Sequence, residues 1–187
     1  MNRYDKLQMY KKMDLEDKIH FSKHRIELFL NKMGSNCVVS FSGGKDSTVL
    51  LHLCRQVKPD IKAIFVDTGL EYPEIRKFVS ITENVETIKP KMRFDEVLRK
   101  YGYPVISKEV SRQISDIRNS KSQKLINKRL YGDEKGKCGK LSDKWKFLIN
   151  SDIKISDKCC DVMKKRPFKK IMKNYNGVFI GTMTEDS

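Results

Sequence analysis

The segment VVSFSGGKDSTVLLHL, residues 38–53, decides the fold of this chain. A short β-branched run leads into a turn with two glycines, a lysine and an aspartate, and apolar residues at helical spacing follow. In a strand–turn–helix unit, unpaired backbone N–H groups and the positive end of the helix dipole point at one place. The segment therefore predicts a site for an anion, and a nucleotide phosphate is the simplest candidate.

The residue types in this turn refine the prediction. Gly43 and Gly44 let the backbone approach an anion without a Cβ atom in the way, and Lys45 adds a full positive charge. Asp46 would repel phosphates unless a cation intervened, so it predicts a magnesium ion bound through oxygen. The turn is neither a Walker A sequence nor a G-x-G-x-x-G motif. An ordinary serine-capped turn would leave Lys45 and Asp46 unexplained. Further hydroxyl donors are Ser42, Ser47 and Thr48.

Strand and helix patterns alternate along the first half of the chain. This alternation predicts an α/β fold with a doubly wound parallel sheet. Ligands of such sheets bind beyond the carboxyl ends of the strands, which is where both SGGKDS and DTG (67–69) fall. The predicted strands cover residues 37–41, 61–67 and 85–90, and the predicted helices cover 14–33, 47–57, 73 to about 82, and 94–101.

The second half of the chain is less regular. Its pattern predicts a polar helical stretch over 107–130 and a short helix over 143–150 around Trp145. A later helix is expected to break at Arg166 and to restart at Pro167. An apolar strand over 177–182 follows, and the chain stops five residues later. We therefore expect a domain that is truncated at its C-terminus.

Composition is that of a soluble globular domain. The 187 residues suffice for one domain, of which 39% are apolar and 34% are charged. No apolar run is long enough to span a membrane, and the first residues lack the apolar region of a signal peptide. We therefore expect a cytoplasmic protein that does not associate with membranes.

The net charge of +15 predicts an anionic partner. Lysine outnumbers arginine 29 to 10 and only one alanine occurs, a pattern typical of biased codon usage that raises lysine everywhere. The surplus is nevertheless uneven, because the region from Lys108 to Lys173 holds 20 basic and 8 acidic residues. A solvated lysine-rich face or a site for a small anion is the favoured interpretation of this region, and a contact with nucleic acid is the alternative.

Four stretches resemble one known family. SFSGGKDS (40–47) resembles the pyrophosphate loop of the adenine nucleotide α-hydrolase superfamily. FVDTGLEYPE (65–74), PVISKEVSRQI (104–114) and GTMTEDS (181–187) look like landmarks of its phosphoadenosine phosphosulfate (PAPS) reductase branch. The resemblance implies an adenine nucleotide α-hydrolase-like fold: a Rossmann-like parallel sheet of five strands with helices on both faces. It also implies a nucleotide-binding domain over 36–187, after an N-terminal helical segment over 1–35.

The resemblance further implies where an adenine nucleotide would bind across the carboxyl edge of the sheet. Lys45 and Asp46 would be catalytic, and Asp46 would hold the magnesium ion. The phosphates would lie on Ser40, Ser42, Gly43, Gly44, Lys45, Asp46 and Ser47. The adenosine would lie near Asp67, Thr68 and Gly69, with Gly181 and Thr182 closing over it.

The intact loop favours ATP as the substrate. Reductases of the branch act on a nucleotide without β- and γ-phosphates and typically have a degenerate loop. SGGKDS looks instead like the versions that cleave ATP between the α- and β-phosphates. We therefore expect an enzyme that adenylylates an acceptor and releases pyrophosphate in sulfur-transfer or related chemistry. The alternatives are a thiol-dependent reductase of PAPS or adenylyl sulfate, and a non-catalytic nucleotide-binding subunit of a sulfur-transfer or DNA-modification complex.

The five cysteines divide into two kinds. Cys37 and Cys54 lie in apolar surroundings and predict buried thiols. The adjacent Cys159 and Cys160 resemble half of the iron–sulfur motif of adenylyl-sulfate reductases. The second half, a C-x-x-C pair, is absent and Cys138 would add one ligand at most, so a 4Fe–4S cluster is not favoured. Either the chain is a truncated or minimal form, whose missing redox half a partner protein would supply, or Cys159 and Cys160 are relics that pack in the core. If a thiolate of the pair acts, four basic residues are expected to lower its pKa: Lys158, Lys164, Lys165 and Arg166.

Overall fold

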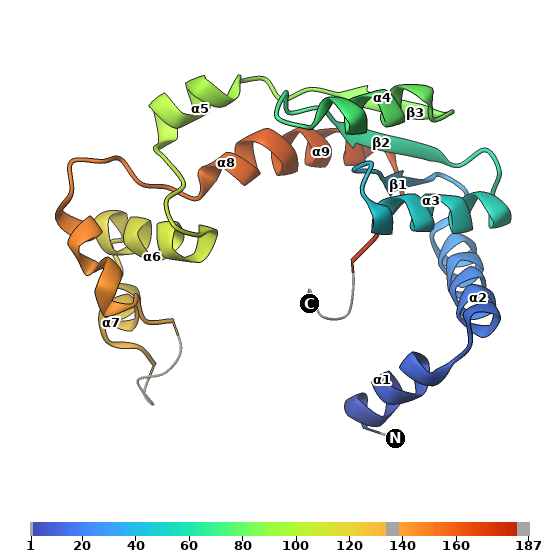
Figure 1. Cartoon of the computed structure of the whole chain (residues 1–187), viewed down its shortest axis with the longest axis horizontal. Helices are drawn as coiled ribbons and strands as arrows, with labels where there is room; N and C mark the ends of the chain where they lie inside the picture. The colour runs from blue at the N-terminus through green and yellow to red at the C-terminus, as the bar shows by residue number, and fades with distance from the viewer. Residues whose placement is uncertain (1, 134–138, 183–187) are drawn as a thin grey trace. The chain divides into compact units, whose positions relative to one another are not determined.

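A computed structural model of the chain describes residues 2–133 and 139–182. The chain divides into two compact units. Met1–Ile88 and Phe168–Ser187 make up the first, which contains the sheet, and Lys89–Pro167 make up the second, which is helical (Figure 1). We call them the sheet unit and the helical unit. The domain boundary that the resemblance implies between residues 35 and 36 stays a prediction.

Four parallel strands form the sheet within the described residues, in the order β3-β2-β1-β4 (Figure 1). In register, Val39 of the central strand lies opposite Ala63 and Phe179 of its two neighbours. Neither Val38 nor Val39 is exposed to solvent, so this strand is buried on both faces, which explains its uninterrupted apolar run. The strands are β1 (Cys37–Ser40), β2 (Lys62–Val66), β3 (Val85–Ile88) and β4 (Gly177–Ile180).

The strand order reverses between β1 and β4, because β2 and β3 follow on one side of β1 and β4 lies on the other. Such a reversal is the place where sheets of this class bind ligands. The parallel α/β sheet is confirmed, but the described residues contain four strands where the resemblance implies five. After β3 the chain folds into helices, and the described residues add only an isolated parallel bridge between Tyr103 and Ile155. The fifth strand therefore stays a prediction.

The helices of the sheet unit pack apolar stripes on the sheet. Ile26 and Leu51, from the helices before and after β1, join Val39 and Phe65 in the main core. The helices predicted over 14–33, 47–57 and 73–82 are confirmed to within two residues, whereas the first helix was not expected. No described helix combines the length and apolar character that a membrane crossing requires. The helices are α1 (Arg3–Lys12), α2 (Leu15–Met33), α3 (Lys45–Val57) and α4 (Pro73–Ile81), with the 3-10 turn η3 (Met172–Asn174).

The helical unit has two small cores. One surrounds Ile114 and Leu148, and the other surrounds Val97 and Met163. The stretch predicted over 107–130 splits into two helices, because Ser122 caps the second one by accepting a hydrogen bond from the Leu125 amide. The elements are α5 (Phe94–Tyr101), α6 (Lys108–Asn119), α7 (Gln123–Tyr131), the 3-10 helix η1 (Asp143–Asn150), α8 (Lys158–Cys160) and η2 (Asp161–Lys165). A last helix, α9 (Arg166–Ile171), begins in this unit and ends in the sheet unit.

The predicted helix break at Arg166 is wrong. The helix continues from α8 through η2 into α9, and η2 is a stretch of π-helix. Pro167 has no N–H group to donate, and the wider turn of a π-helix lets the chain pass such a residue without ending the helix. Arg166 also donates a hydrogen bond to the carboxylate of Asp161 at 2.8 Å, which ties the two ends of η2 together.

Arg118 of α6 holds the end of η1 in place. Its guanidinium donates hydrogen bonds to the carbonyl oxygens of Ile149 at 2.8 Å, Ser151 at 2.7 Å and Ile153 at 2.6 Å, and also to that of Leu148. Carbonyl groups at the end of a helix have no partner within the helix, so a side chain that binds several of them replaces water there. The planar guanidinium fits this task because its N–H groups point in several fixed directions.

We predict that Arg118→Lys lowers the free energy of unfolding by about 2 kcal/mol, because an ammonium group cannot reach all of these carbonyls at once. The matched control is Arg112→Lys on the same helix, where the exposed side chain makes no ion pair or hydrogen bond with a described residue. Urea denaturation followed by circular dichroism measures both. Equal stabilities of the two variants would contradict the role assigned to Arg118.

Candidate phosphate-binding site

The turn between β1 and α3 is held by the hydroxyl group of Ser47. This hydroxyl donates to the carbonyl oxygen of Gly44 at 3.0 Å and accepts from the backbone amide of Ser42 at 3.2 Å. The Ser42 hydroxyl lies 2.9 Å from it and accepts from the Gly44 amide at 3.3 Å. Two of the predicted hydroxyl donors therefore shape the turn, and Thr48 adds a bond from its own hydroxyl to Gly44 at 2.8 Å.

Four backbone N–H groups in this turn make no hydrogen bond with another described residue. They belong to Gly43, Lys45, Asp46 and Ser47, whereas the amides of Ser42, Gly44 and Thr48 are used within the turn. The open groups lie at the start of α3, a helix of 13 residues whose dipole adds positive potential there. Open N–H groups at the start of a helix can bind an anion, and we call these four groups the anion cradle.

Lys45 and Asp46 lie beside the cradle with exposed side chains. Within the described residues neither makes an ion pair, so the charge of Lys45 is not neutralised by its neighbour. No group of three or more His, Cys, Asp or Glu side chains in the described ranges could hold a metal ion. A magnesium ion at Asp46 would therefore take its other ligands from phosphate oxygens and water, as this ion commonly does.

The DTG segment lies at the same edge of the sheet, but its side chains hold their own turn. Asp67 accepts hydrogen bonds from Arg76 at 2.7 Å and from the Gly69 amide at 3.0 Å. The hydroxyl and the amide of Thr68 both donate to the Glu71 carboxylate, at 2.7 and 3.0 Å. The Asp67 carboxylate raises the pKa of Arg76. Glu71 and Arg76 were not predicted as site residues from the sequence. Glu71 lies within FVDTGLEYPE and Arg76 two residues after it.

The end of β4 meets the start of α3. A Cβ atom added to Gly181 would lie 2.9 Å from the carbonyl oxygen of Asp46 and 3.1 Å from the amide nitrogen of Ser47. Real Cβ atoms essentially never come within 3.0 Å of another heavy atom. The backbone at Gly181 therefore passes directly beside the anion cradle, and only glycine fits there without movement.

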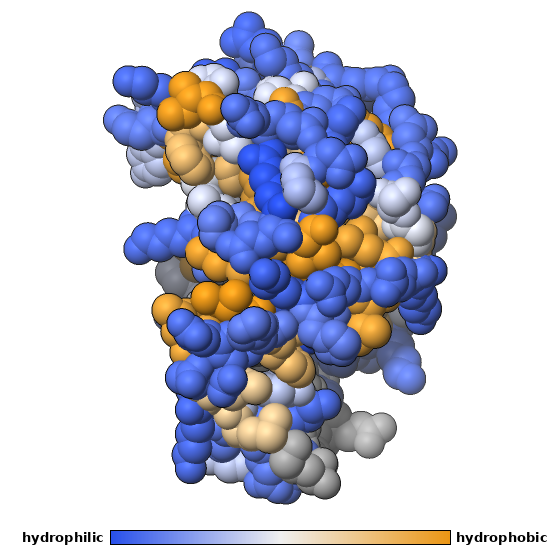
Figure 2. Space-filling model, turned by 90° about the vertical axis from the view of Figure 1, so that its right-hand side faces the viewer, coloured by the Kyte–Doolittle hydropathy of each residue, from blue (hydrophilic) through white to orange (hydrophobic). Residues whose placement is uncertain are grey.

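A groove of about 650 Å³ runs between α2, α3 and β4 and reaches the cradle at Asp46. This volume lies within the range of small-molecule sites. On the side that carries α2 and α3, Figure 2 shows hydrophobic residues exposed in a band among hydrophilic ones. The apolar floor of the groove includes Ile26, Phe29, Leu50, Leu53 and Phe179, and its polar lining comes from Ser22, Arg25, Asp46 and Thr182.

Two residues of this groove were missed from the sequence. Ser22 and Arg25 belong to α2, where they share a face with Phe29 because they stand three to seven residues apart. The guanidinium of Arg25 makes no ion pair with another described residue. A serine and an arginine on the apolar face of an amphipathic helix are the pattern that could have drawn attention to them.

The cysteine predictions are partly confirmed. Cys37 and Cys54 are buried, and burial raises the pKa of Cys54 to about 12. Cys159 is half-buried in α8, and burial raises its pKa above the usual value of 9.0, so the expected lowering by basic neighbours is wrong. One of those neighbours, Arg166, is already bound to Asp161. Cys138 lies outside the described residues, and the described ones assemble no cluster of metal ligands.

A family model described as phosphoadenosine phosphosulfate reductase domain matches residues 36–187. The match covers the sheet, the anion cradle and the whole helical unit. It begins after α2, so the face of the groove that carries Ser22 and Arg25 lies outside it.

Shorter stretches of the chain are similar to curated proteins. The phosphoadenosine 5'-phosphosulfate reductase of Alteromonas mediterranea is 40% identical over 58 residues, which are 31% of this chain and 23% of that protein. The enzyme of the same name from Buchnera aphidicola is 40% identical over 63 residues, 34% of this chain and 26% of that protein. An uncharacterised protein of Methanocaldococcus jannaschii is 43% identical over 70 residues, which are 35% of this chain and 17% of that protein. The matched stretches thus span about a quarter or less of these relatives.

We predict that Gly43→Ala lowers the free energy of unfolding by about 3 kcal/mol, because left-handed backbone strain and a steric clash add up. Gly43 has a φ of +73°, and its added Cβ would lie 2.8 Å from Cγ2 of Ile75 in α4. Gly69→Ala is the matched control, since its φ is +81° but nothing lies within 4 Å of the added Cβ.

In Gly69→Ala the free energy of unfolding should fall by only about 1 kcal/mol, because the backbone strain is present there without the steric clash. Urea denaturation compares the two variants with the unmodified protein. Equal losses would show that Ile75 does not press on the turn.

We also predict that Cys159 reacts slowly with Ellman's reagent. Thiol modification follows the thiolate fraction, so a raised pKa moves the midpoint of the rate profile to higher pH. In a Cys138→Ser/Cys160→Ser protein the contribution of Cys160 is lost but burial, the main cause, remains, so the midpoint for Cys159 should still lie above 9.0, while Cys37 and Cys54 react only after unfolding. A midpoint below 9.0 would restore the activating role of the basic neighbours.

Proposed function

The chain belongs to the phosphoadenosine phosphosulfate reductase domain family, and from this premise we propose that it cleaves ATP between the α- and β-phosphates. The observation that supports the proposal is the anion cradle, whose four N–H groups make no hydrogen bond with another described residue and beside which the Lys45 side chain is exposed. A nucleotide with β- and γ-phosphates uses all of these groups, whereas a sulfonucleotide has no pyrophosphate to place there.

The reaction we propose is the transfer of the adenylyl group. A nucleophile of the acceptor attacks the α-phosphorus, the new bond forms there, and the bond to the β-phosphate oxygen breaks, which releases pyrophosphate. The N–H groups of the turn and Lys45 stabilise the charge that grows on the leaving group. A magnesium ion shared by Asp46 and the phosphates would supply further charge stabilisation. No nucleophile of this chain is needed, because the acceptor provides it.

The two remaining parts of the site have separate tasks in this proposal. The adenosine lies near Thr68 and Gly69 at the end of β2, with Gly181 and Thr182 closing over it. The groove that begins at Asp46 is left for the acceptor. Its apolar floor suits an organic molecule, and the guanidinium of Arg25, which lies over the Phe21 ring and makes no ion pair with another described residue, suits an anionic group on that molecule. The acceptor could also be presented by a partner protein.

A second candidate is a thiol-dependent reductase of PAPS or adenylyl sulfate, because relatives from Alteromonas and Buchnera carry the name PAPS reductase. This chemistry needs a reactive thiol. The described cysteines offer less support for it, since burial raises the pKa of Cys159 and both Cys37 and Cys54 are buried. Sulfite release that disappears in a Cys159→Ser/Cys160→Ser protein would favour the reductase.

We predict that Lys45→Ala lowers the rate of pyrophosphate release by about a hundredfold or more, the usual effect of removing a group that stabilises transition-state charge. The matched control is Lys58→Ala at the other end of α3, where the lysine pairs with Asp60 at 2.8 Å. It should keep the rate within about twofold.

The assay follows ATP labelled at the α-phosphate, so that AMP and adenylylated products are separated from ADP. Labelled ADP as the main product would contradict the proposed position of cleavage. A Lys45→Ala protein with the unmodified rate would contradict the proposed role of Lys45.

A further inference from the structure

The positive charge of the chain is concentrated in the helical unit. Lys89–Pro167 hold 22 basic and 10 acidic residues, a net charge of +12 in 79 residues. Met1–Ile88 and Phe168–Ser187 hold 17 basic and 14 acidic residues, a net charge of +3 in 108 residues. Biased codon usage acts on both units alike, so it does not explain the difference. The charge of the helical unit therefore points to an anionic partner.

Helix α7 presents one continuous polar face to solvent. Exposed and half-buried residues alternate along this helix, and Leu125, Ile126 and Leu130 are half-buried on its inner side. The exposed lysines make no ion pair with another described residue, and the ring of Tyr131 is 69% exposed. On the same face Gln123 donates a hydrogen bond to Asn127 at 2.9 Å. The exposed residues are Gln123, Lys124, Asn127, Lys128 and Tyr131.

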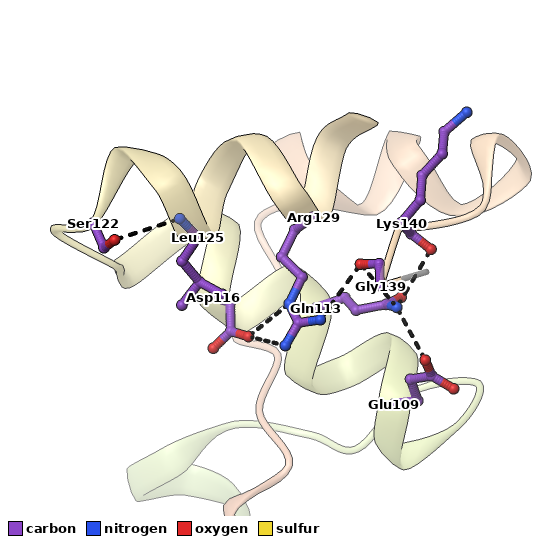
Figure 3. A network of polar contacts seen from close by, with 8 residues as sticks. All are labelled: Glu109, Gln113, Asp116, Ser122, Leu125, Arg129, Gly139 and Lys140. Atoms are coloured by element: carbon purple, nitrogen blue, oxygen red, sulfur yellow. Dashed lines mark hydrogen bonds and ion pairs between the residues drawn. The ribbon is translucent and has the colours of Figure 1, made fainter. Parts of the chain in front are cut away.

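The inner side of α7 is fixed to α6 and to the residues before η1, as Figure 3 shows. Arg129 pairs with Asp116 of α6 at 2.9 Å, and its carbonyl oxygen accepts from the Leu141 amide at 2.7 Å. The buried amide of Gln113 donates to Glu109 at 3.2 Å and to the carbonyl oxygen of Lys140 at 3.3 Å. The outer face is therefore held on a preformed surface, which lowers the cost of binding.

Further cations precede α7 in the sequence or line a recess beside it. Lys121 stands directly before the cap of α7 and is exposed. Lys108 and Arg112 of α6 line, together with Arg129, a recess of about 370 Å³. The side chains of Lys108 and Arg112 are exposed and make no ion pair with a described residue, although Glu109 also lines the recess. We call the exposed side of α7 with Lys108, Arg112 and Lys121 the α7 face.

We propose that the α7 face binds the phosphate backbone of nucleic acid. Lysine, asparagine, glutamine and tyrosine are side chains that contact phosphates and sugars in such complexes, and an exposed aromatic ring can stack on an unpaired base. A helix that lies on a membrane needs a continuous exposed apolar face, which α7 lacks because its apolar residues point inward. This proposal does not depend on the cleavage of ATP by the sheet unit.

The test measures binding of fluorescein-labelled DNA of about 20 nucleotides, single-stranded and duplex, by fluorescence anisotropy over a range of salt concentrations. If the α7 face neutralises about four phosphates, the slope of log K against log salt is about −3 for the single strand. In Lys121→Gln/Lys124→Gln/Lys128→Gln the affinity at low salt should fall about tenfold or more, and the slope should become less negative by about 2. Glutamine keeps the helix propensity of lysine, so the fold is expected to persist.

The matched control is Lys12→Gln/Lys32→Gln/Lys77→Gln, which removes the same charge from exposed lysines of the sheet unit. The affinity of this control for DNA should lie within about threefold of that of the unmodified protein. Lys124→Arg/Lys128→Arg keeps the charge and should bind DNA as tightly as the unmodified protein. Tyr131→Ala should weaken single strands more than duplex.

Three outcomes would overturn the proposal. They are no salt-dependent binding of either DNA, an equal loss in the two lysine-to-glutamine proteins, and binding of phosphatidylserine vesicles that is as tight as DNA binding and needs the same lysines.

Discussion

The turn between β1 and α3 has to reverse the chain while four of its N–H groups bind no other residue that the structure describes, and the sheet unit is built around this constraint. The hydroxyl group of Ser47 holds the turn in this form by bonding to both Ser42 and Gly44. Groups left open in this way cost free energy unless water or an anion binds them. The neighbouring elements leave room for the turn. Gly43 lies against α4 and Gly181 against the first turn of α3, both at distances that exclude a Cβ atom.

The same constraint explains why the candidate site lies where it does. The strand order reverses between β1 and β4, and the start of α3 lies at the carboxyl end of β1 beside this point. The groove of about 650 Å³ begins at this point and is completed by α2, which precedes the part of the chain that the family model matches. A ligand of this groove would thus be recognised in part by residues that the family model does not describe.

The sequence predicted the parts in which local pattern and packing agree. Three such parts are the β-branched run of β1, the glycine turn and the periodic helix α3. They could be predicted because apolar residues are spaced differently in a buried strand and in an amphipathic helix. The prediction failed where the outcome depends on partners distant in sequence or on unusual backbone. The count of basic residues near Cys159 suggested a low pKa, but burial dominates and Arg166 is paired with Asp161. Pro167 suggested a break, but a π-helical stretch carries the helix past it.

The identity of the nucleotide that binds to the anion cradle is the central claim, and two calorimetric titrations under anaerobic conditions test it directly. One uses ATP with magnesium and the other uses PAPS, on the same freshly purified protein. We expect ATP to bind at least about tenfold more tightly than PAPS, since only ATP offers a pyrophosphate to the open N–H groups and Lys45. Tighter binding of PAPS would contradict the account, and it would mean that the turn accommodates a sulfonucleotide instead.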